Sequence, residues 1–542
     1  MSNKKRKKAY RGRAPQAKGY GDAGASFQRR ATRGFNAQSG SPNEDINWNN
    51  ATLRQRSRML FMSAPLATSA IKTSRAKVVG PGLTLKCDID REALGMTPEQ
   101  AKAWARQTEA EFRLWADRKM NCDAIGMSNF AGLQQLVLMS WLQSGDVFAL
   151  VKRYDPTPTN PYSLRLHLIE ADRVSTPIKW RKAATTGGMT DGVVNGNGNR
   201  IYDGVEVNNE GLVVAYHISN TYPMEITGEP QEWIRVQAVG EITGLPNIIH
   251  VMAGERPDQY RGVPYLAAVI EPILQLRRYT ESQLMAALIQ SFFTAWIKTK
   301  TDPNAIPINE VGGGNIAGDV PTMNPQEENI SNSENEYEMG PGTVTHLEQD
   351  EDIVFGNPQI PTAGFDTFVQ TFCELVGAAL EIPNEVLLKK FDASYSASRG
   401  ALLEAWEGFK IRRTWLVDQF CQPVYETWLA EAVARGRIKA PGFFDDPRIR
   451  AEWCRARWIG PVQGQLDPLK EAKAAVLKIR HGIATHSEVT REMGGGDWES
   501  NVEQLTHENE LLAAADIRNF AEWEESIMNE EDDDEGSEKE SE

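Results

Sequence analysis

Glu170 and Asp172 are the pair of side chains in this chain whose spacing is most suggestive of acid–base or Mg²⁺ chemistry. They follow a run, Leu164–Ile169, in which Leu164, Leu166 and Leu168 alternate with polar residues, so the run is predicted to be a strand. Arg173 comes next in the chain. Two interpretations therefore stay open: a reactive pair of carboxylates, or an ion pair with Arg173 at the end of a strand.

Other chemical motifs are missing from the sequence. The seven histidines show no HExxH spacing, and neither a GxxxxGK[ST] loop nor a strand-to-helix GxGxxG is present. The five cysteines are widely spaced and form no CxxC pair, which suits a reducing cytoplasm. We therefore expect no metal, no nucleotide and no other cofactor.

Charge is concentrated at the two ends of the chain. The formal net charge is −15, yet residues 1–34 hold eleven Lys and Arg, and residues 522–542 hold twelve Asp and Glu. Both ends lack apolar residues and are expected to be disordered, over 1–45 and 521–542. The basic end can bind phosphates without sequence readout or can serve as a solubilising arm, and both interpretations stay open. No apolar stretch is long enough to span a bilayer, so a soluble protein with no membrane contact is expected.

The elements that must position these residues begin with helices. Asn49 and Asn50 can cap a helix to about Met62, and a second is expected over Ala67–Lys77. Thr97-Pro98-Glu99-Gln100 is a capping box. The helix that it opens places Trp104, Thr108, Phe112 and Trp115 on one face. Another helix is expected over about Ser128–Gln143, ending at Gly145.

A strand-rich region follows. Strands are predicted at Val147–Lys152, Leu164–Ile169, Val205–Val207, Leu212–Ile218, Trp233–Val236 and Ile248–Met252, all in one small sheet. Residues 185–200, rich in Gly and Asn, read as a flexible loop between them.

The rest of the chain returns to helical patterns around a polar insertion. A long helical region is expected to follow Pro264 and to reach Lys298, kinked or restarted at Pro272, and the next helix is expected over about Ala363–Leu380. Between them, Thr343–Leu347 and Asp352–Phe355 are predicted to pair as a hairpin. A long helix over Ser396–Val433 should kink at Pro423. Further helices begin at Asp467-Pro468 and at the capping box Thr485-His486-Ser487-Glu488.

Three landmarks in this order resemble one known family. They are Ile169-Glu170-Ala171-Asp172-Arg173-Val174, Gln259-Tyr260-Arg261-Gly262-Val263 and Ser394-Tyr395-Ser396-Ala397-Ser398-Arg399. With the other landmarks over residues 45–520, they are similar to the lambda-type portal proteins of tailed bacteriophages. The residues that carry the match are Asp172, Arg173, Gln259, Arg261, Gly262, Tyr395, Ser396 and Arg399. One departure is the turn at Glu348-Gln349-Asp350-Glu351, where the family tends to have a Pro-Gly turn.

The resemblance implies an α+β portal-protein fold and a division of the chain into named parts. These are a wing over 46–263 and 434–465, stem helices over 264–299 and 363–382, a clip over 300–362, a channel loop over 383–397, a kinked long helix over 398–433 and a helical crown over 466–520. Long helices around a polar insertion are consistent with a stem that carries a tip.

The resemblance further implies a ring, usually of twelve subunits, at one capsid vertex, assembled in the bacterial host cytoplasm and carried in the virion. Double-stranded DNA would pass through it during packaging and ejection. The terminase large subunit, a head–tail adaptor and the major capsid or scaffold protein would be its partners, and it would not itself be an enzyme. Lys389, Lys390 and Arg399 are the residues expected to face the DNA, although Arg399 can instead be tied to Glu404 or to a neighbouring subunit. The alternatives are a metal-dependent nuclease that uses Glu170 and Asp172, and a cytoplasmic scaffold protein.

Overall fold

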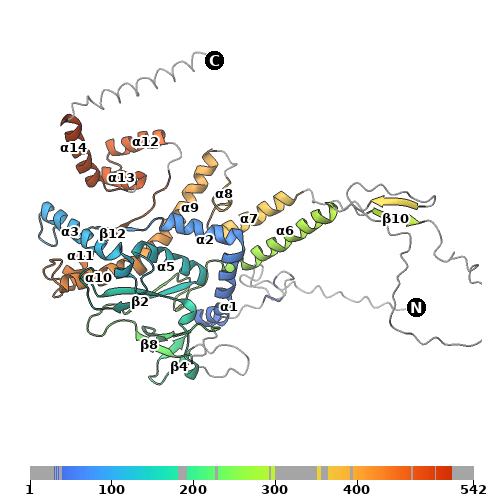
Figure 1. The fold of residues 1–542 in the computed structure, drawn as a ribbon, viewed down its shortest axis with the longest axis horizontal. Helices are drawn as coiled ribbons and strands as arrows, with labels where there is room; N and C mark the ends of the chain where they lie inside the picture. Colours follow the sequence, from blue (N-terminus) through green and yellow to red (C-terminus); the bar gives the residue numbers. More distant parts are fainter. Residues whose placement is uncertain are drawn as a thin grey trace, which may run out of the picture. The chain divides into compact units, whose positions relative to one another are not determined.

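The structure is a computed structural model that describes most of the chain. The described residues are 39–180, 192–225, 230–291, 295–299, 351–355, 364–390, 395–464, 468–494 and 496–514, with 30, 32, 34 and 35. The chain divides into two compact units, Glu271–Ala379 on the one hand and Met1–Ile270 with Leu380–Glu542 on the other. Helices and strands are both present throughout, which confirms the predicted α+β class (Figure 1).

The larger unit opens with helices that pack against one another. They are α1 (Pro42–Ser63), α2 (Pro65–Val78), α3 (Pro98–Ala116), α4 (Lys119–Cys122) and α5 (Phe130–Ser144). The prediction for the first of them is wrong at its start: Ser41 and Glu44 form a capping box, so α1 begins before Asn49. The capping box at Thr97 and the buried face of α3 are confirmed.

The strands form two larger sheets where one was predicted. A three-stranded antiparallel sheet has the order β3-β2-β9, from β2 (Asp146–Arg153), β3 (Leu164–Glu170) and β9 (Ile248–Met252). The second sheet runs β4-β5-β6-β7-β8, from β4 (Val193–Val194), β5 (Arg200–Tyr202), β6 (Val205–Val207), β7 (Val213–Ser219) and β8 (Trp233–Gln237). Apolar side chains of both sheets share one core, in which Phe148 and Ile248 pack with Tyr216 and Ile218.

Short 3₁₀ turns at Ala171–Arg173, Ile178–Trp180 and Ala267–Val269 connect these elements. A separate two-stranded sheet pairs β1 (Thr84–Cys87) with β12 (Ala456–Ile459). Part of the predicted loop 185–200 lies outside the described residues; its described end forms β4 and the start of β5.

The second part of the larger unit begins with α8 (Asn384–Leu388) and the long helix. That helix is confirmed as α9 (Tyr395–Leu416), a π-helical turn at Val417–Cys421 and α10 (Gln422–Ala434), so the irregularity falls directly before Pro423. Then come α11 (Pro447–Trp453), α12 (Pro468–Arg480), α13 (His486–Gly494) and α14 (Trp498–Ala514). The aromatic rings of Phe112, Phe130, Phe420 and Trp428 meet where α3, α5 and the long helix pack together.

The smaller unit contains two helices and a hairpin. In α6 (Ile270–Ser291) and α7 (Phe365–Ala379), Tyr279 stacks on Phe365 with 5.7 Å between ring centroids, and the two helices lie side by side (Figure 1). The end predicted for the helix after Pro264 is wrong: α6 ends at Ser291, and residues 295–299 form strand β10 (Ala295–Thr299). β10 pairs with β11 (Glu351–Phe355), which contains the predicted strand Asp352–Phe355. The hairpin partner predicted for that strand, Thr343–Leu347, lies outside the described residues.

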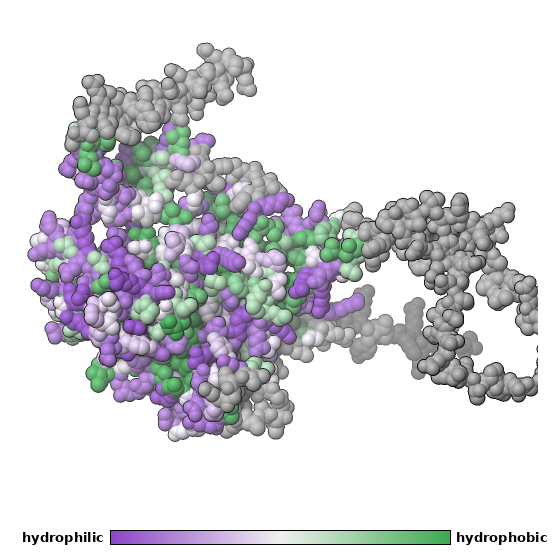
Figure 2. Space-filling view, viewed as in Figure 1, coloured by the Kyte–Doolittle hydropathy of each residue, from purple (hydrophilic) through white to green (hydrophobic). Residues whose placement is uncertain are grey.

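The predicted polar insertion and both terminal tails fall mostly outside the described residues. On the face shown in Figure 2, hydrophilic residues predominate, and the hydrophobic ones are scattered among them. Among the described helices, none combines the length and the apolar character that a membrane crossing requires.

Candidate functional site

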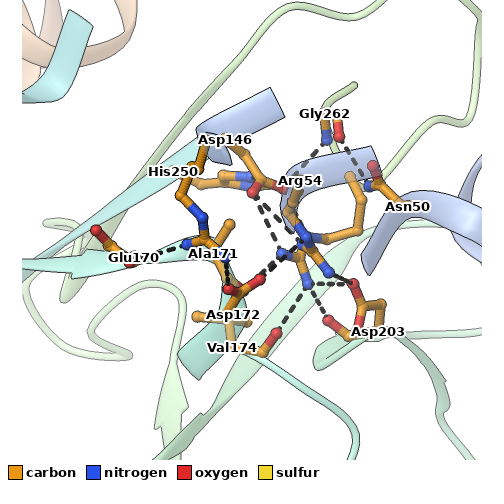
Figure 3. A network of polar contacts seen from close by, with 12 residues as sticks. Asn50, Arg54, Asp146, Glu170, Ala171, Asp172, Val174, Asp203, His250 and Gly262 are labelled. Atoms are coloured by element: carbon orange, nitrogen blue, oxygen red, sulfur yellow. Dashed lines mark hydrogen bonds and ion pairs between the residues drawn. The ribbon is translucent and has the colours of Figure 1, made fainter. Parts of the chain in front are cut away.

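Two glycines bring the landmark at 259–263 against the end of α5. Gly145 ends α5 with φ +88°, a conformation that favours glycine, and Gly262 faces it so closely that a Cβ on Gly262 would lie 1.9 Å from the Gly145 oxygen. The Gly262 N–H donates to Asp146 at 3.1 Å, and the Gly262 carbonyl accepts from Asn50 of α1 at 2.9 Å. The contact joins α1, α5 and this loop at one point. Figure 3 shows Asn50 of α1 and Asp146 beside Gly262.

Arg261 lies at the centre of this site and is completely buried. Its Nε donates to Asp146 Oδ2 at 2.6 Å, and its Nη1 lies 2.8 Å from Asp203 Oδ2. The remaining guanidinium N–H groups reach backbone carbonyls, those of Ala171 and Val174 at 2.9 Å each. A guanidinium with five donors in a fixed fork can tie together several segments in this way. Arg261 therefore holds the ends of β2 and β3 and the turn before β6 in one arrangement.

Two arginines of α1 complete the network. Arg54, which is 3% exposed, bonds Asp203 at 2.9 Å and lies 3.3 Å from Asp172. Arg58 pairs with Glu170 at 3.0 Å and also with Asp172. Three guanidinium groups thus face four carboxylates, Asp146, Glu170, Asp172 and Asp203 (Figure 3).

The electrostatics keep Asp146 and Arg261 ionised. Burial alone would raise the pKa of Asp146, but the positive charge and the hydrogen bonds of Arg261 outweigh burial and hold that pKa far below its ordinary value. Burial would likewise lower the pKa of Arg261, and the charges of Asp146 and Asp203 raise it instead. Burial lowers the pKa of His250 even though Nε2 lies 3.5 Å from Asp146 Oδ2, so His250 is neutral at neutral pH.

This arrangement bears on the two interpretations of Glu170 and Asp172. The predicted ion pair at the strand end exists, but its partner is Arg58, while the Arg173 side chain donates to the Ser219 carbonyl at 3.0 Å. A metal would have to displace guanidinium groups from both carboxylates. In the described part of the chain, no group of three or more His, Cys, Asp or Glu side chains is placed to hold a metal ion. The contacts of Arg261, Arg54 and Arg58 hold segments of the chain together at this site.

The other predicted residues lie in two places. Gln259 shapes the loop of Arg261, because its side chain accepts from the Glu255 N–H at 2.9 Å and donates to the Arg261 carbonyl at 2.8 Å. Lys389 and Lys390 follow α8 and are exposed, and Lys389 ends that helix with φ +57°. They are not part of the network around Arg261.

The third landmark lies at the start of α9. Tyr395 and Ser396 begin that helix, and their side chains lie outside the described ones. Arg399 forms an ion pair with Glu471 of α12.

Arg54 and Asp203 were not predicted as site residues. A signal for Arg54 was present in the sequence, since the buried side of α1 carries a polar stripe at helical spacing: Asn43, Asn47, Asn50, Arg54 and Ser57. A polar stripe usually predicts the side of a helix that faces solvent. In α1 this stripe is buried instead and faces the network around Arg261. Asp203, in a turn with φ +43°, gave no such signal.

In this α+β fold, the landmark residues Gln259, Arg261 and Gly262 fasten distant elements together. Comparison with known proteins gives the family: a family model described as phage portal protein, lambda family, matches residues 28–413. The portal protein of Escherichia phage N15 is 24% identical over 508 residues, covering 92% of this chain and 91% of its own length. Portal protein B of Escherichia phage lambda is 23% identical over 463 residues, covering 83% of this chain and 81% of its own.

Among solved structures, the neck of an empty gene transfer agent (GTA) particle contains a chain that matches 82% of this one and 92% of its own length. The two are 14% identical, with a TM-score of 0.45. The family match spans most of the chain, and the chain therefore belongs to the lambda family of phage portal proteins.

Proposed function

We propose that copies of this chain close into a ring, most simply of twelve, at one vertex of a phage capsid, and that double-stranded DNA passes through its axis during packaging and ejection. The match of the lambda portal family over residues 28–413 carries this proposal. A closed ring requires each subunit to present two different surfaces to its neighbours. The network around Arg261 would keep those surfaces rigid, because it fixes α1, α5 and both sheets relative to one another.

The proposed parts follow the landmarks. The wing would be 46–263 and 434–465, the stem helices 264–299 and 363–382, the clip 300–362, the channel loop 383–397, the kinked helix 398–433 and the crown 466–520. Within these ranges, α6 and α7 would supply the helices of the two stem segments. β10 lies at the end of the first stem range and pairs with β11, which lies within the clip range. The three helices α12, α13 and α14 would form the crown.

DNA must be held centrally and still slide. Strong cationic clamps would grip phosphates by counterion release, whereas the net charge of −15 favours a weakly interacting wall. The exposed Lys389 and Lys390 are the proposed channel-facing cations. Arg399 is a proposed third member, although its ion pair with Glu471 would first have to open.

The proposed partners are the terminase large subunit, a head–tail adaptor and the major capsid or scaffold protein, with assembly in the host cytoplasm and a final place in the virion. The chain would perform no catalysis, and a separate ATPase would supply the energy for translocation. A cytoplasmic scaffold protein is the remaining alternative.

Electron microscopy of the purified full chain tests the proposal. We expect rings with an axial hole wide enough for a duplex. Monomers, filaments or particles that are solid at the centre would contradict it. A nuclease assay with Mg²⁺, run on wild type and on Asp172→Asn, should detect no activity that depends on Asp172.

A further inference from the structure

Helices α12, α13 and α14 carry few buried side chains. Within the described part of residues 468–514, Ala475 alone is buried. Large apolar side chains such as Val476, Ile483 and Leu505 remain exposed by 55%, 74% and 55%. An apolar core therefore does little to hold these helices on the rest of the unit, and another interaction must place them.

Ion pairs join α14 to α3. Lys102 lies 3.6 Å from Glu499 and also pairs with Glu503, and Arg106 pairs with Glu503 as well. Lys86 of β1 adds a contact of 3.7 Å to Asp497, just before α14. These pairs are exposed, so salt screens them and each contributes little stability.

The cations of α3 and the carboxylates of α14 have the same spacing along their helices. Lys102 and Arg106 are four residues apart on α3, and Glu499 and Glu503 are four residues apart on α14, about 6 Å along either helix axis. Among the described residues, the ion pairs of Lys102 and Arg106 are all with α14. Hydrogen bonding from Lys102 and Arg106 lowers the pKa of Glu503, so the carboxylate is fully charged at neutral pH.

A cleft of about 670 Å³ lies between the two sides. The wall formed by α3 and its neighbouring strands is basic on balance, with five cations against Asp88, Glu99 and Glu109: Lys86, Arg91, Lys102, Arg106 and Arg457. Hydrophilic residues cover α3 and the nearby part of α14 in Figure 2. When α14 leaves, this wall becomes an exposed basic surface.

We propose that Lys102 and Arg106 form a phosphate-binding face for double-stranded DNA, which α14 covers with Glu499 and Glu503. The carboxylates occupy the positions that phosphate groups would take, so α14 and DNA compete for the same cations. The choice of DNA as the polyanion rests on the proposed function. The consequence is that α12–α14 should detach from α3 when DNA or salt is concentrated around them.

Zero-length carbodiimide coupling measures the covered state, because it links Lys102 to Glu503 only while they are paired. On the full-length chain, peptide mass spectrometry should show the cross-link at low salt. Its yield should fall towards about 1 M KCl, where the Debye length is about 3 Å. A mixed-sequence duplex added at low salt should lower the yield as well. A yield that responds to neither would overturn the proposal.

Fluorescence anisotropy with the same duplex measures the uncovered face. E499Q/E503Q should bind DNA more tightly than its matched control E508Q/E510Q, which removes the same charge from exposed positions of the same helix. The slope of log K against log[KCl] should steepen by about 2, since each of the two cations adds about 0.9. The basic N-terminal residues are present in every variant and cancel in the comparison.

Adding K102Q/R106Q to E499Q/E503Q should abolish the gain in DNA affinity. The proposal is wrong if E499Q/E503Q binds no better than its control, or if the gain survives K102Q/R106Q. Circular dichroism should match wild type in all variants, because the changed side chains are exposed. Neither the cross-link yield nor the anisotropy difference requires a ring. If both fail, electron microscopy can still show the proposed ring, and if no ring forms, the anisotropy difference can still be measured.

Discussion

At the scale of single residues, Arg261 shows how burial changes the free energy lost when one partner of an ion pair is removed. Its guanidinium is fully buried and neutralises Asp146, which is also 0% exposed. Arg261→Met should lower the free energy of unfolding by about 3–5 kcal/mol, because it leaves a buried carboxylate unpaired. Urea unfolding measures this change. The matched control is Arg457→Met, which breaks the exposed ion pair of Arg457 with Asp88 and is expected to cost about 1 kcal/mol or less.

The double variant R261M/D146N provides the internal check for that prediction. Because the penalty arises from the unpaired charge, removing the carboxylate as well should recover part of the loss. Strictly additive effects of the two substitutions would mean that the pair is not the cause.

Gly262 illustrates a steric requirement rather than an electrostatic one. Gly262→Ala places a Cβ 1.9 Å from the Gly145 oxygen, and the obstacle is backbone, so α5 or the loop must move. We expect a loss of about 3 kcal/mol or more, as for other severe overpacking. Thermal unfolding of G262A compared with G464A tests this, since a Cβ at Gly464 meets no atom within 4 Å. Equal melting temperatures would show that the backbones are not in contact.

At the scale of elements, Glu431 fastens α10 to β3. Glu431 is 8% exposed. Its carboxylate accepts the Leu164 N–H at 3.0 Å and the Ser163 N–H at 2.5 Å, and it pairs with Arg435. Glu431→Gln replaces one acceptor oxygen by a donor that faces N–H groups. We therefore expect a loss of about 1.5–3 kcal/mol in urea unfolding.

Glu426→Gln is the control for that change, because Glu426 is only half-buried and accepts a hydrogen bond from the Gln422 side chain at 3.0 Å. It should cost less, about 1 kcal/mol or less. Hydrogen exchange would locate the effect: the N–H groups of Ser163 and Leu164 should exchange faster in E431Q and unchanged in E426Q. Faster exchange spread evenly over the unit would count against a local fastening role.

The whole molecule should respond to acid in two stages. Burial lowers the pKa of His217 and of His250 below 6.5, so the unfolded chain takes up protons first, and stability is lost as pH falls below 6.5. Burial would raise the pKa of Glu206, but hydrogen bonds from Arg235 and Asn199 outweigh burial and lower it to about 2, so its contribution is lost between pH 4.5 and about 2.

Urea midpoints measured across this pH range test both stages. Wild type should lose stability from pH 6.5 downwards, and Glu206→Gln should flatten the second stage. Because Glu206 also contacts His217 at 3.0 Å and raises its pKa, Glu206→Gln should extend the first stage to lower pH. An acid limb of E206Q that is as steep as that of wild type would show that Glu206 does not set it.

Local signals in the sequence determined much of the fold. The capping boxes at Thr97 and Thr485, the apolar face of α3 and the alternation in β3 all act over a few residues, and the structure confirms them. The order of landmarks such as Gln259-Tyr260-Arg261-Gly262 determined the family. These signals are reliable because a helix cap or a strand period depends on neighbours in the chain.

Only the tertiary structure decided which distant residues meet. The sequence offered Arg173 as the partner of Glu170 and Asp172, whereas folding brings Arg58 to them from more than a hundred positions away. In the same way β11 pairs with β10, and the polar side of α1 turns inwards to the carboxylates. A buried charge takes whichever partner the packing of elements supplies, and no local period encodes that choice.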